Sequence, residues 1–232
     1  MAGHTETDFE KAIEHGLTSQ GGYARRSPTD FDEDLCLFPA DVVGFLKDTQ
    51  PQKWDQLEAL LKGQTEDQVL SDLTKELTTK GTLHVLRHGF RCYGKTLRLA
   101  YFQPNTGMNP ETTALYAQNR LTITRQVAFT SVKKAPGGKA KRCILDVTLA
   151  VNGLPVATAE LKNPMTGQRA VDAKKQYERD RDERDLMFKF KERALVHFAV
   201  DPDEVWMTTR LKGSETFFLP FNKGHNRGAG NP

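Results

Sequence analysis

The chain has 232 residues, of which 33 are basic and 30 acidic, so its net charge of +3 does not by itself indicate a nucleic-acid-binding protein. No apolar run approaches the roughly 20 residues that a membrane span needs, and the N-terminus lacks a signal segment, which together predict a soluble, cytoplasmic protein. Cys36, Cys92 and Cys143 lie far apart without a CxxC pair, which argues against a zinc site or a disulfide framework.

Residues 1–80 are expected to be mainly helical. Thr7-Asp8-Phe9-Glu10 has the spacing of a capping box and opens a helix through Leu17. Pro39 suits the first turn of a second helix, and residues 54–61 continue as helix. A second capping box at Thr65-Glu66-Asp67-Gln68 precedes an apolar stripe at helical spacing. Such stripes are typical of core packing.

Residues 81–220 are expected to contain the sheet and to form a single domain with the helical part. His84 and His88 lie four apart in a strand-like segment, which would set them about 13 Å apart along the chain, too far to share a metal ion. The charged stretch 170–184 predicts an exposed helix, and His197 is expected to be a hydrogen-bonded strand residue. The Gly- and Asn-rich segment 221–232 is predicted to be a linker toward a further domain. Strands are expected at 82–87, 96–102, 120–130, within 142–162, at 194–200 and at 204–209.

One motif in this region suggests a P-loop nucleotide-binding protein. The segment Gly89–Thr96, GFRCYGKT, matches the Walker A pattern GxxxxGK[ST]. A P-loop follows a strand and opens a helix, whereas residues 96–102 alternate like a strand that is stopped by Pro104. We therefore expect a loop between strands here, and ATP binding is the less favoured interpretation.

The segment from Arg142 to Lys162 has the pattern of a β-hairpin. Alternate residues are apolar, and Asn152-Gly153 is a strong turn signal. A two-residue loop would pair Asp146 with Ala159, whereas a three-residue loop or a bulged equivalent would place Asp146 opposite Glu160. We prefer the second register because it gathers the apolar residues on one face. That face would hold Leu145, Val147, Leu149, Val151, Ala157, Ala159 and Leu161.

In the preferred register two carboxylates face each other across the hairpin. Their Cβ atoms would lie roughly 4.5–5.5 Å apart, close enough to repel unless a cation or a proton lies between them. Asp146, Glu160 and the backbone carbonyl of Leu161 would form an oxygen-rich Mg²⁺ site, where Lys162 could orient or help to deprotonate a metal-bound water. Glu-x-Lys alone is also typical of a solvated strand with a cross-strand charge pair. The facing Asp favours the metal site.

These residues carry a family resemblance. Asp146, with Glu160-Leu161-Lys162 and Asn163-Pro164, resembles the Asp…Glu-x-Lys core of the PD-(D/E)xK nuclease superfamily, as found in the N-terminal endonuclease domain of type I restriction enzyme R subunits. Leu145 departs from the family's Pro, and Asp180 replaces a helical Tyr, whose work Tyr177 or Arg181 could take over. The resemblance runs from about residue 8 to the C-terminus, through Asn119-Arg120-Leu121, Arg125-Gln126, Val151 to Pro155, Gln176-Tyr177, Asp180-Arg181, Val196 to Val200 and Met207 to Arg210.

The resemblance implies an α/β fold with a mixed central β-sheet flanked by helices, and Mg²⁺-dependent cleavage of double-stranded DNA. Asp146 and Glu160 would be the metal ligands and Lys162 the catalytic lysine. ATP-driven translocation would belong to a motor domain beyond this chain. The partners would be the methyltransferase and specificity subunits of a type I restriction complex. The alternative is a non-catalytic DNA-binding or subunit-docking module of the same fold.

Two helices offer supporting residues. Some members of the superfamily supply a further carboxylate from the first helix, and Glu10 or Glu14, four apart on one face, could do so here. Gln176, Tyr177 and Arg181 on the charged helix, together with Arg125 and Gln126, are expected to support the site or to touch the DNA backbone.

A cluster of basic residues precedes the hairpin. It surrounds Gly137-Gly138 and either meets phosphates or is only a solvated loop tip. Its members are Lys133, Lys134, Lys139, Lys141 and Arg142.

Overall fold

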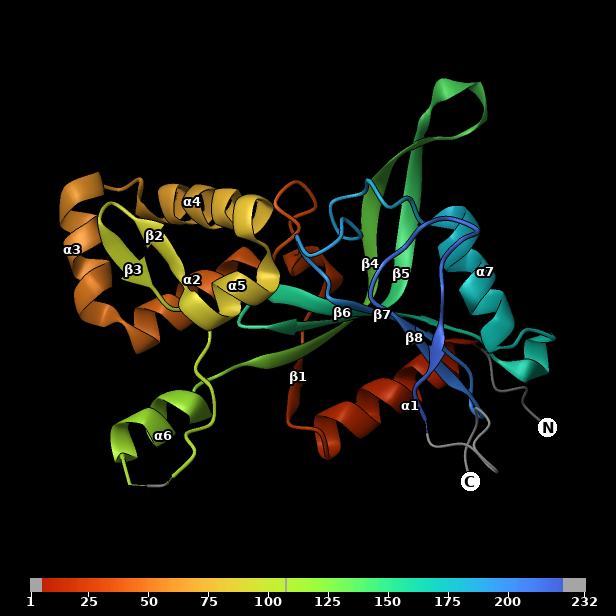
Figure 1. Ribbon diagram of the computed structural model, residues 1–232, viewed down its shortest axis with the longest axis horizontal. Helices are drawn as coiled ribbons and strands as arrows, with labels where there is room; N and C mark the ends of the chain where they lie inside the picture. The colour runs from red at the N-terminus through yellow and green to blue at the C-terminus, as the bar shows by residue number, and fades with distance from the viewer. Residues whose placement is uncertain (1–5, 107, 223–232) are drawn as a thin grey trace.

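The computed structural model describes residues 6–106 and 108–222, which form a mixed α/β fold (Figure 1). In this part of the chain a seven-stranded sheet has the order β1-β4-β5-β6-β7-β8-β9. Neighbouring strands are antiparallel except in the pairs β1/β4 and β6/β7. The expected fold class is confirmed. The strands are β1 (Tyr23–Arg25), β4 (Leu121–Lys134), β5 (Ala140–Val151), β6 (Leu154–Leu161), β7 (Val196–Val200), β8 (Val205–Thr208) and β9 (Leu219–Pro220).

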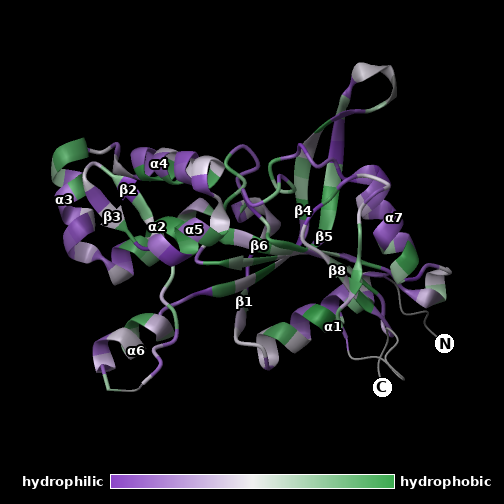
Figure 2. Cartoon of the chain, viewed as in Figure 1, coloured by the Kyte–Doolittle hydropathy of each residue, from purple (hydrophilic) through white to green (hydrophobic). Residues whose placement is uncertain are grey.

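The helices lie on both faces and at one end of the sheet (Figure 1). Hydrophilic residues colour the outward turns of α4 and α7 in Figure 2. No helix in the described ranges is long and apolar enough to cross a membrane. The helices are α1 (Glu6–Ser19), α2 (Pro39–Thr49), α3 (Pro51–Leu61), α4 (Thr65–Lys80), α5 (Thr82–His88), α6 (Pro110–Ala117) and α7 (Ala170–Asp180).

Most predicted elements appear near their expected positions, with differences at their ends. The capping box expected at Thr65 is absent, because α4 begins at Thr65 itself and its cap, Gln64, makes no side-chain cap hydrogen bond. Helix α7 ends at Asp180, and one of its faces is buried through Ala170, Ala173 and Tyr177. The predicted linker lies mostly outside the described residues. Cys36, Cys92 and Cys143 are all free and buried.

Helices α2 to α5 and a separate hairpin form a helical lobe, residues 39–99, with its own apolar core. The turn of the β5/β6 hairpin joins this lobe to the sheet. Phe38 donates its backbone N–H to the carbonyl of Gly153 at 2.8 Å. A Cβ at Gly153 would lie only 2.6 Å from the Phe38 carbonyl oxygen, so the close approach requires glycine. Asn152 adds a second contact between the turn and the lobe, because its side-chain amide donates to the carbonyl of Leu99.

The strand expected at residues 82–87 is wrong, because these residues form helix α5. Thr82, Val85 and Leu86 are its buried residues, and their i, i+3, i+4 spacing is that of a helical face. The rings of His84 and His88 consequently lie close together, tilted, with centroids 4.7 Å apart, instead of lying far apart along a strand.

The Walker-like segment forms a tight hairpin. Strands β2 (Phe90–Cys92) and β3 (Lys95–Leu97) pair antiparallel, with Cys92 opposite Lys95. Tyr93 and Gly94 both have positive φ, at 43° and 75°, as a two-residue hairpin turn requires. A P-loop needs a loop that opens a helix, so this geometry contradicts the nucleotide-binding alternative. The expected strand 96–102 also ends early, at Leu97.

The β5/β6 hairpin combines the two registers that the sequence left open. Its turn has two residues, since Val151 pairs with Leu154. A bulge follows, after which Leu149 pairs with Ala157 and Val147 with Ala159. The bulge therefore supplies the offset expected from a three-residue loop and brings Asp146 and Glu160 to the same level at the end of the ladder.

The predicted single apolar face of β5 is interrupted at Asp146. Val147 packs in a core beneath α1 with Ile123, whereas Leu145 packs in a second core beneath α7 with Val127. On β4, Gln126 lies between Ile123 and Val127 and has a φ of 58°, which breaks the pleat without adding a residue to the β4/β5 register. Both strands therefore change face at Gln126 and Asp146.

The core beneath α7 contains a buried histidine that generates a testable prediction. His197 is 1% exposed, and its Nδ1 lies 2.8 Å from the Thr158 hydroxyl oxygen. Burial lowers the pKa of His197 to about 3, so its imidazole is neutral in the folded protein at neutral pH.

Because the unfolded chain binds a proton below about pH 6.5 and the folded chain does not, His197 should reduce stability as the pH falls. From pH 6.5 to 4.5 we expect the wild-type free energy of unfolding to fall by up to about 2.5 kcal/mol more than that of His197→Asn. Urea unfolding of both proteins at several pH values checks this. Identical pH slopes would contradict the neutral buried imidazole.

Candidate active site

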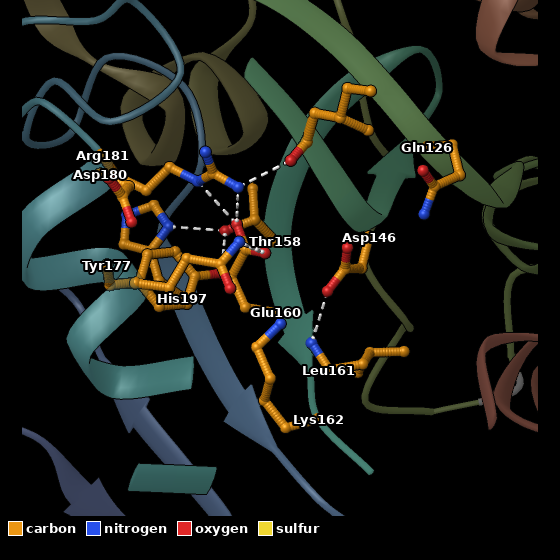
Figure 3. A network of polar contacts seen from close by, with 12 residues as sticks. Gln126, Asp146, Thr158, Glu160, Leu161, Lys162, Tyr177, Asp180, Arg181 and His197 are labelled. Carbon is orange, nitrogen blue, oxygen red and sulfur yellow. Dashed lines mark hydrogen bonds and ion pairs between the residues drawn. The ribbon is translucent and has the colours of Figure 1, made fainter. Parts of the chain in front are cut away.

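Figure 3 shows Asp146, Glu160, Leu161 and Lys162 at the end of the β5/β6 hairpin, beside Tyr177 and Arg181. Helix α1 reaches the same region through hydrogen bonds between Glu6 and Lys162 and between Glu10 and Gln126. Asp146 lies on β5, Glu160 and Leu161 end β6, and Lys162 follows directly. Helix α7 covers Glu160, and helix α1 faces Asp146 and Lys162 from the other side of the sheet. The face change at Asp146 turns its side chain toward a cavity of about 550 Å³, which α1 also lines.

Asp146 is half-buried and fixed by the backbone of the neighbouring strand. Its Oδ2 accepts the Leu161 N–H at 2.7 Å (Figure 3). Burial raises the pKa of Asp146, the hydrogen bond from Leu161 and the charge of Lys162 oppose this shift, and the charge of Glu6 adds to it. A carboxylate in this position favours a nearby cation.

Glu160 is fully buried and is held by two side chains from α7 and the residue after it. Arg181 donates from Nε to Oε1 at 2.7 Å, and Gln176 donates from Nε2 to Oε2 at 2.7 Å. Arg181 also donates to the carbonyl of Ile144, which ties the pair to β5. Burial raises the pKa of Glu160 and the charge of Arg181 opposes this, while the charge of Asp146 adds to the rise.

Tyr177, also on α7, lies in the buried core beside this pair. It is 0% exposed, and its hydroxyl lies 2.8 Å from that of Thr158, which also contacts His197. Buried Tyr177 is in no position to touch DNA. Gln176 and Arg181 are likewise engaged with Glu160, so the α7 residues named from the sequence surround the carboxylate instead of forming a free surface.

Lys162 is paired with a residue that the sequence analysis missed. Its Nζ donates to Oε1 of Glu6 at 2.8 Å. Glu6 is 37% exposed at its side chain, whereas Lys162 is only 10% exposed. The sequence did contain one indication of Glu6. Glu6, Glu10 and Glu14 are spaced four residues apart, which places all three on one face of α1.

Glu10 and Glu14 line the cavity beside Asp146 and are engaged by β4. Gln126 donates to Glu10 Oε1 at 2.8 Å, and Arg125 lies within 3.4 Å of both carboxylates. Burial and the charge of Asp146 raise the pKa of Glu10, which Arg125 opposes. Arg125 and Gln126 therefore position the acidic face of α1 against Asp146.

The donor chemistry fits a hard divalent cation. Asp146, Glu160 and the Leu161 carbonyl are the oxygen groups that could hold such a cation. Burial, and after it the charge of neighbouring carboxylates, raises the pKa of both acids, and a bound cation would offset that cost. No three metal-ligating side chains converge within the part of the chain that the structure describes. Mg²⁺ is commonly bound through one or two carboxylates and several waters, so two suffice.

Comparison with known families decides the relationship of this chain. The family model for the N terminus of the type I restriction enzyme R protein matches residues 39–216. The chain belongs to this family. The match covers β4 to β8 and α7, and therefore Asp146, Glu160 and Lys162, whereas the acidic residues of α1 lie outside it. No curated protein matches the chain.

The buried Glu160–Arg181 pair of this type I R-protein domain should dominate its local stability. Removing one partner of a buried pair leaves an uncompensated charge and costs about 3–5 kcal/mol. We expect Arg181→Met to lower the free energy of unfolding by about this amount at pH 7.5, measured by urea denaturation. Adding Glu160→Gln should restore part of the loss, because no buried charge then remains.

The matched control is Arg184→Met, which breaks the more exposed pair between Arg184 and Asp182. A surface pair contributes only about 0–1 kcal/mol. Equal losses for Arg181→Met and Arg184→Met would show that burial of the first pair is not what makes it costly to break.

Proposed function

We propose that this chain is the DNA-cutting module of a type I restriction enzyme and hydrolyses phosphodiester bonds with Mg²⁺. The observation that carries the proposal is the bulged β5/β6 register, which sets Asp146 level with Glu160, two residues before Lys162, while Asp146 lines a polar cavity. Family membership supports a role in restriction, and the geometry supplies candidates for the chemistry.

In this proposal Asp146, Glu160 and the Leu161 carbonyl hold the metal. Bound Mg²⁺ would lower the pKa of a coordinated water and stabilise negative charge on the scissile phosphate. Lys162 would exchange its contact with Glu6 for the substrate, where its ammonium orients the attacking water or stabilises developing charge. Arg181 and Gln176 keep the Glu160 carboxylate fixed, and Gln126 and Arg125 do the same for Glu10.

The substrate and partners that we propose rest on family membership alone. The proposed substrate is double-stranded DNA, and the proposed partners are the methyltransferase and specificity subunits of a type I restriction complex. ATP-driven translocation is assigned to a motor domain other than the one described.

One observation favours a second candidate function, a non-catalytic DNA-binding or docking module. Both oxygens of Glu160 already accept hydrogen bonds, from Arg181 and Gln176, so its carboxylate has a complete structural role without a metal. The two functions differ in what Asp146 and Lys162 must do.

Metal binding can be tested without cleavage. We expect 10 mM Mg²⁺ to raise the melting temperature of the wild-type chain and to leave that of Asp146→Asn unchanged, because a ligand stabilises the state that binds it. Without metal, Asp146→Asn should be at least as stable as the wild type, since the raised pKa of Asp146 indicates that its charge is costly. Equal Mg²⁺ shifts in both proteins would count against Asp146 as a ligand.

Catalysis is tested in the complete restriction enzyme. Removing one group that stabilises charge in the transition state typically costs about 10²–10³-fold, so Lys162→Ala should reduce the rate of plasmid linearisation by roughly that factor while ATP hydrolysis continues. The control is Lys174→Ala, within the similar tripeptide Asp172-Ala173-Lys174 on α7. Wild-type cleavage by Lys162→Ala or Asp146→Ala would favour the non-catalytic module.

A further inference from the structure

The distal part of the β4/β5 hairpin projects away from the rest of the molecule (Figure 1). We call residues 130–142 the finger. Its two strands pair through Thr130 opposite Arg142 and Ser131 opposite Lys141, and a turn of 3-10 helix, Pro136–Gly138, caps the tip. Four of the five basic residues expected at a loop tip therefore lie on the two strands, and Lys139 lies in the turn between them.

The finger concentrates positive charge that the chain as a whole lacks. Residues 126–145 contain five basic residues and no Asp or Glu, which leaves 28 basic against 30 acidic residues elsewhere. The distal stretch of β5 is correspondingly coloured hydrophilic in Figure 2. The near-neutral net charge of the protein thus hides a local cationic element. The five residues are Lys133, Lys134, Lys139, Lys141 and Arg142.

Protein contacts neutralise the base of the finger but leave its tip free. Lys141 pairs with Asp180, and Arg142 pairs with Glu33. Lys133 donates to the carbonyl of Arg179 at the end of α7. Lys134 and Lys139 are exposed, and neither side chain makes a hydrogen bond or ion pair with any residue in the described ranges.

The finger is also anchored where it leaves the sheet. Asp185 is 2% exposed and accepts hydrogen bonds from the Ser131 hydroxyl and from the Val132 N–H. At the tip, Ala135 donates its N–H to the carbonyl of Lys139 at 2.9 Å. These contacts fix the direction of the ribbon and place both free lysines next to its tip.

The same strand connects the finger to the candidate site. Lys139 directly precedes β5 and lies seven positions before Asp146, which corresponds to roughly 23 Å of extended chain. That span is comparable with the width of a DNA duplex, and a two-stranded β-ribbon fits the major groove, about 12 Å wide. Lysines on such a ribbon reach phosphates on the groove walls.

We propose that the finger is a duplex-positioning element: Lys134 and Lys139 contact DNA phosphates while the ribbon lies along the major groove beside the bond to be cut. The inference rests on the proposed function for the identity of the substrate. Phosphate contacts carry no direct sequence information, so the finger would hold any duplex at the site.

DNA fits this surface better than an acidic protein does. The free charges are two lysines at the end of a narrow ribbon, without the aromatic or Arg anchors that usually dominate protein interfaces. Binding to the regular row of DNA phosphates requires only lysine charges placed close enough to reach them. Docking to a protein subunit is the competing outcome of the experiment.

The test measures binding of the full chain to a fluorescent 30-base-pair duplex by anisotropy, in EDTA and across a series of salt concentrations. Each lost phosphate contact should lower the slope of log K against log salt by about one. We expect Lys134→Gln/Lys139→Gln to reduce the slope by about two, equally for duplexes of unrelated sequence. The control Lys75→Gln/Lys80→Gln, on α4, carries the same charge change and should leave the slope unchanged.

An unchanged slope for the finger variant, an equal reduction in the control, or no DNA binding by the unaltered chain would overturn the inference. A finger variant that binds DNA normally but no longer assembles with the other subunits would instead assign the finger to protein docking. Binding is measured in EDTA, where no metal-dependent cleavage occurs. The binding result therefore does not depend on whether Lys162 is catalytic. The finger inference and the cutting function can therefore fail separately.

Discussion

The architecture around the site depends on one constraint, the burial of the Glu160 carboxylate. A charge without solvent is tolerated only when it is paired and hydrogen-bonded, and Arg181 and Gln176 meet that condition from α7. Arg181 in turn binds the carbonyl of Ile144, so the same guanidinium joins α7, β6 and β5. Helix, strand and hairpin must all be in place for the pair to form, which makes the candidate site a product of the whole sheet and not of the hairpin alone.

The second constraint is the break in the pleat at Gln126 and Asp146. Regular alternation would send Asp146 toward α7 with Glu160, whereas the positive φ of Gln126 accompanies a change of face in both strands. Asp146 consequently meets the acidic face of α1, and Glu160 meets α7. A non-Gly residue held at positive φ is strained, and such strain is common where a side chain must be aimed at a site.

The sequence predicted those parts of the site that depend on local patterns. Asn152-Gly153 and the apolar alternation gave the hairpin, and comparison of apolar faces gave the offset between Asp146 and Glu160. The break at Gln126 was not predictable, because its cause is a backbone conformation with no mark in the apolar pattern. Helix α5 was missed because seven residues with few apolar positions satisfy a strand template as well as a helical one. The Glu6 contact with Lys162 joins residues 156 apart, which no local pattern specifies.

Under the proposed function, the distribution of charge along β5 resolves a conflict that faces any metal-dependent enzyme acting on DNA. The metal site needs carboxylates, and carboxylates repel the phosphates that must approach them. Around Asp146 the cations Lys162, Arg125 and Arg181 are already engaged with Glu6, Glu10 and Glu160, so little positive charge remains there to attract a polyanion. The finger carries its free lysines at the tip of the β4/β5 hairpin. Lys139 lies roughly 23 Å along the chain from Asp146, well beyond the Debye length of about 8 Å at physiological salt. Attraction for the duplex and affinity for the metal can thus coexist on one hairpin, because distance keeps each from cancelling the other.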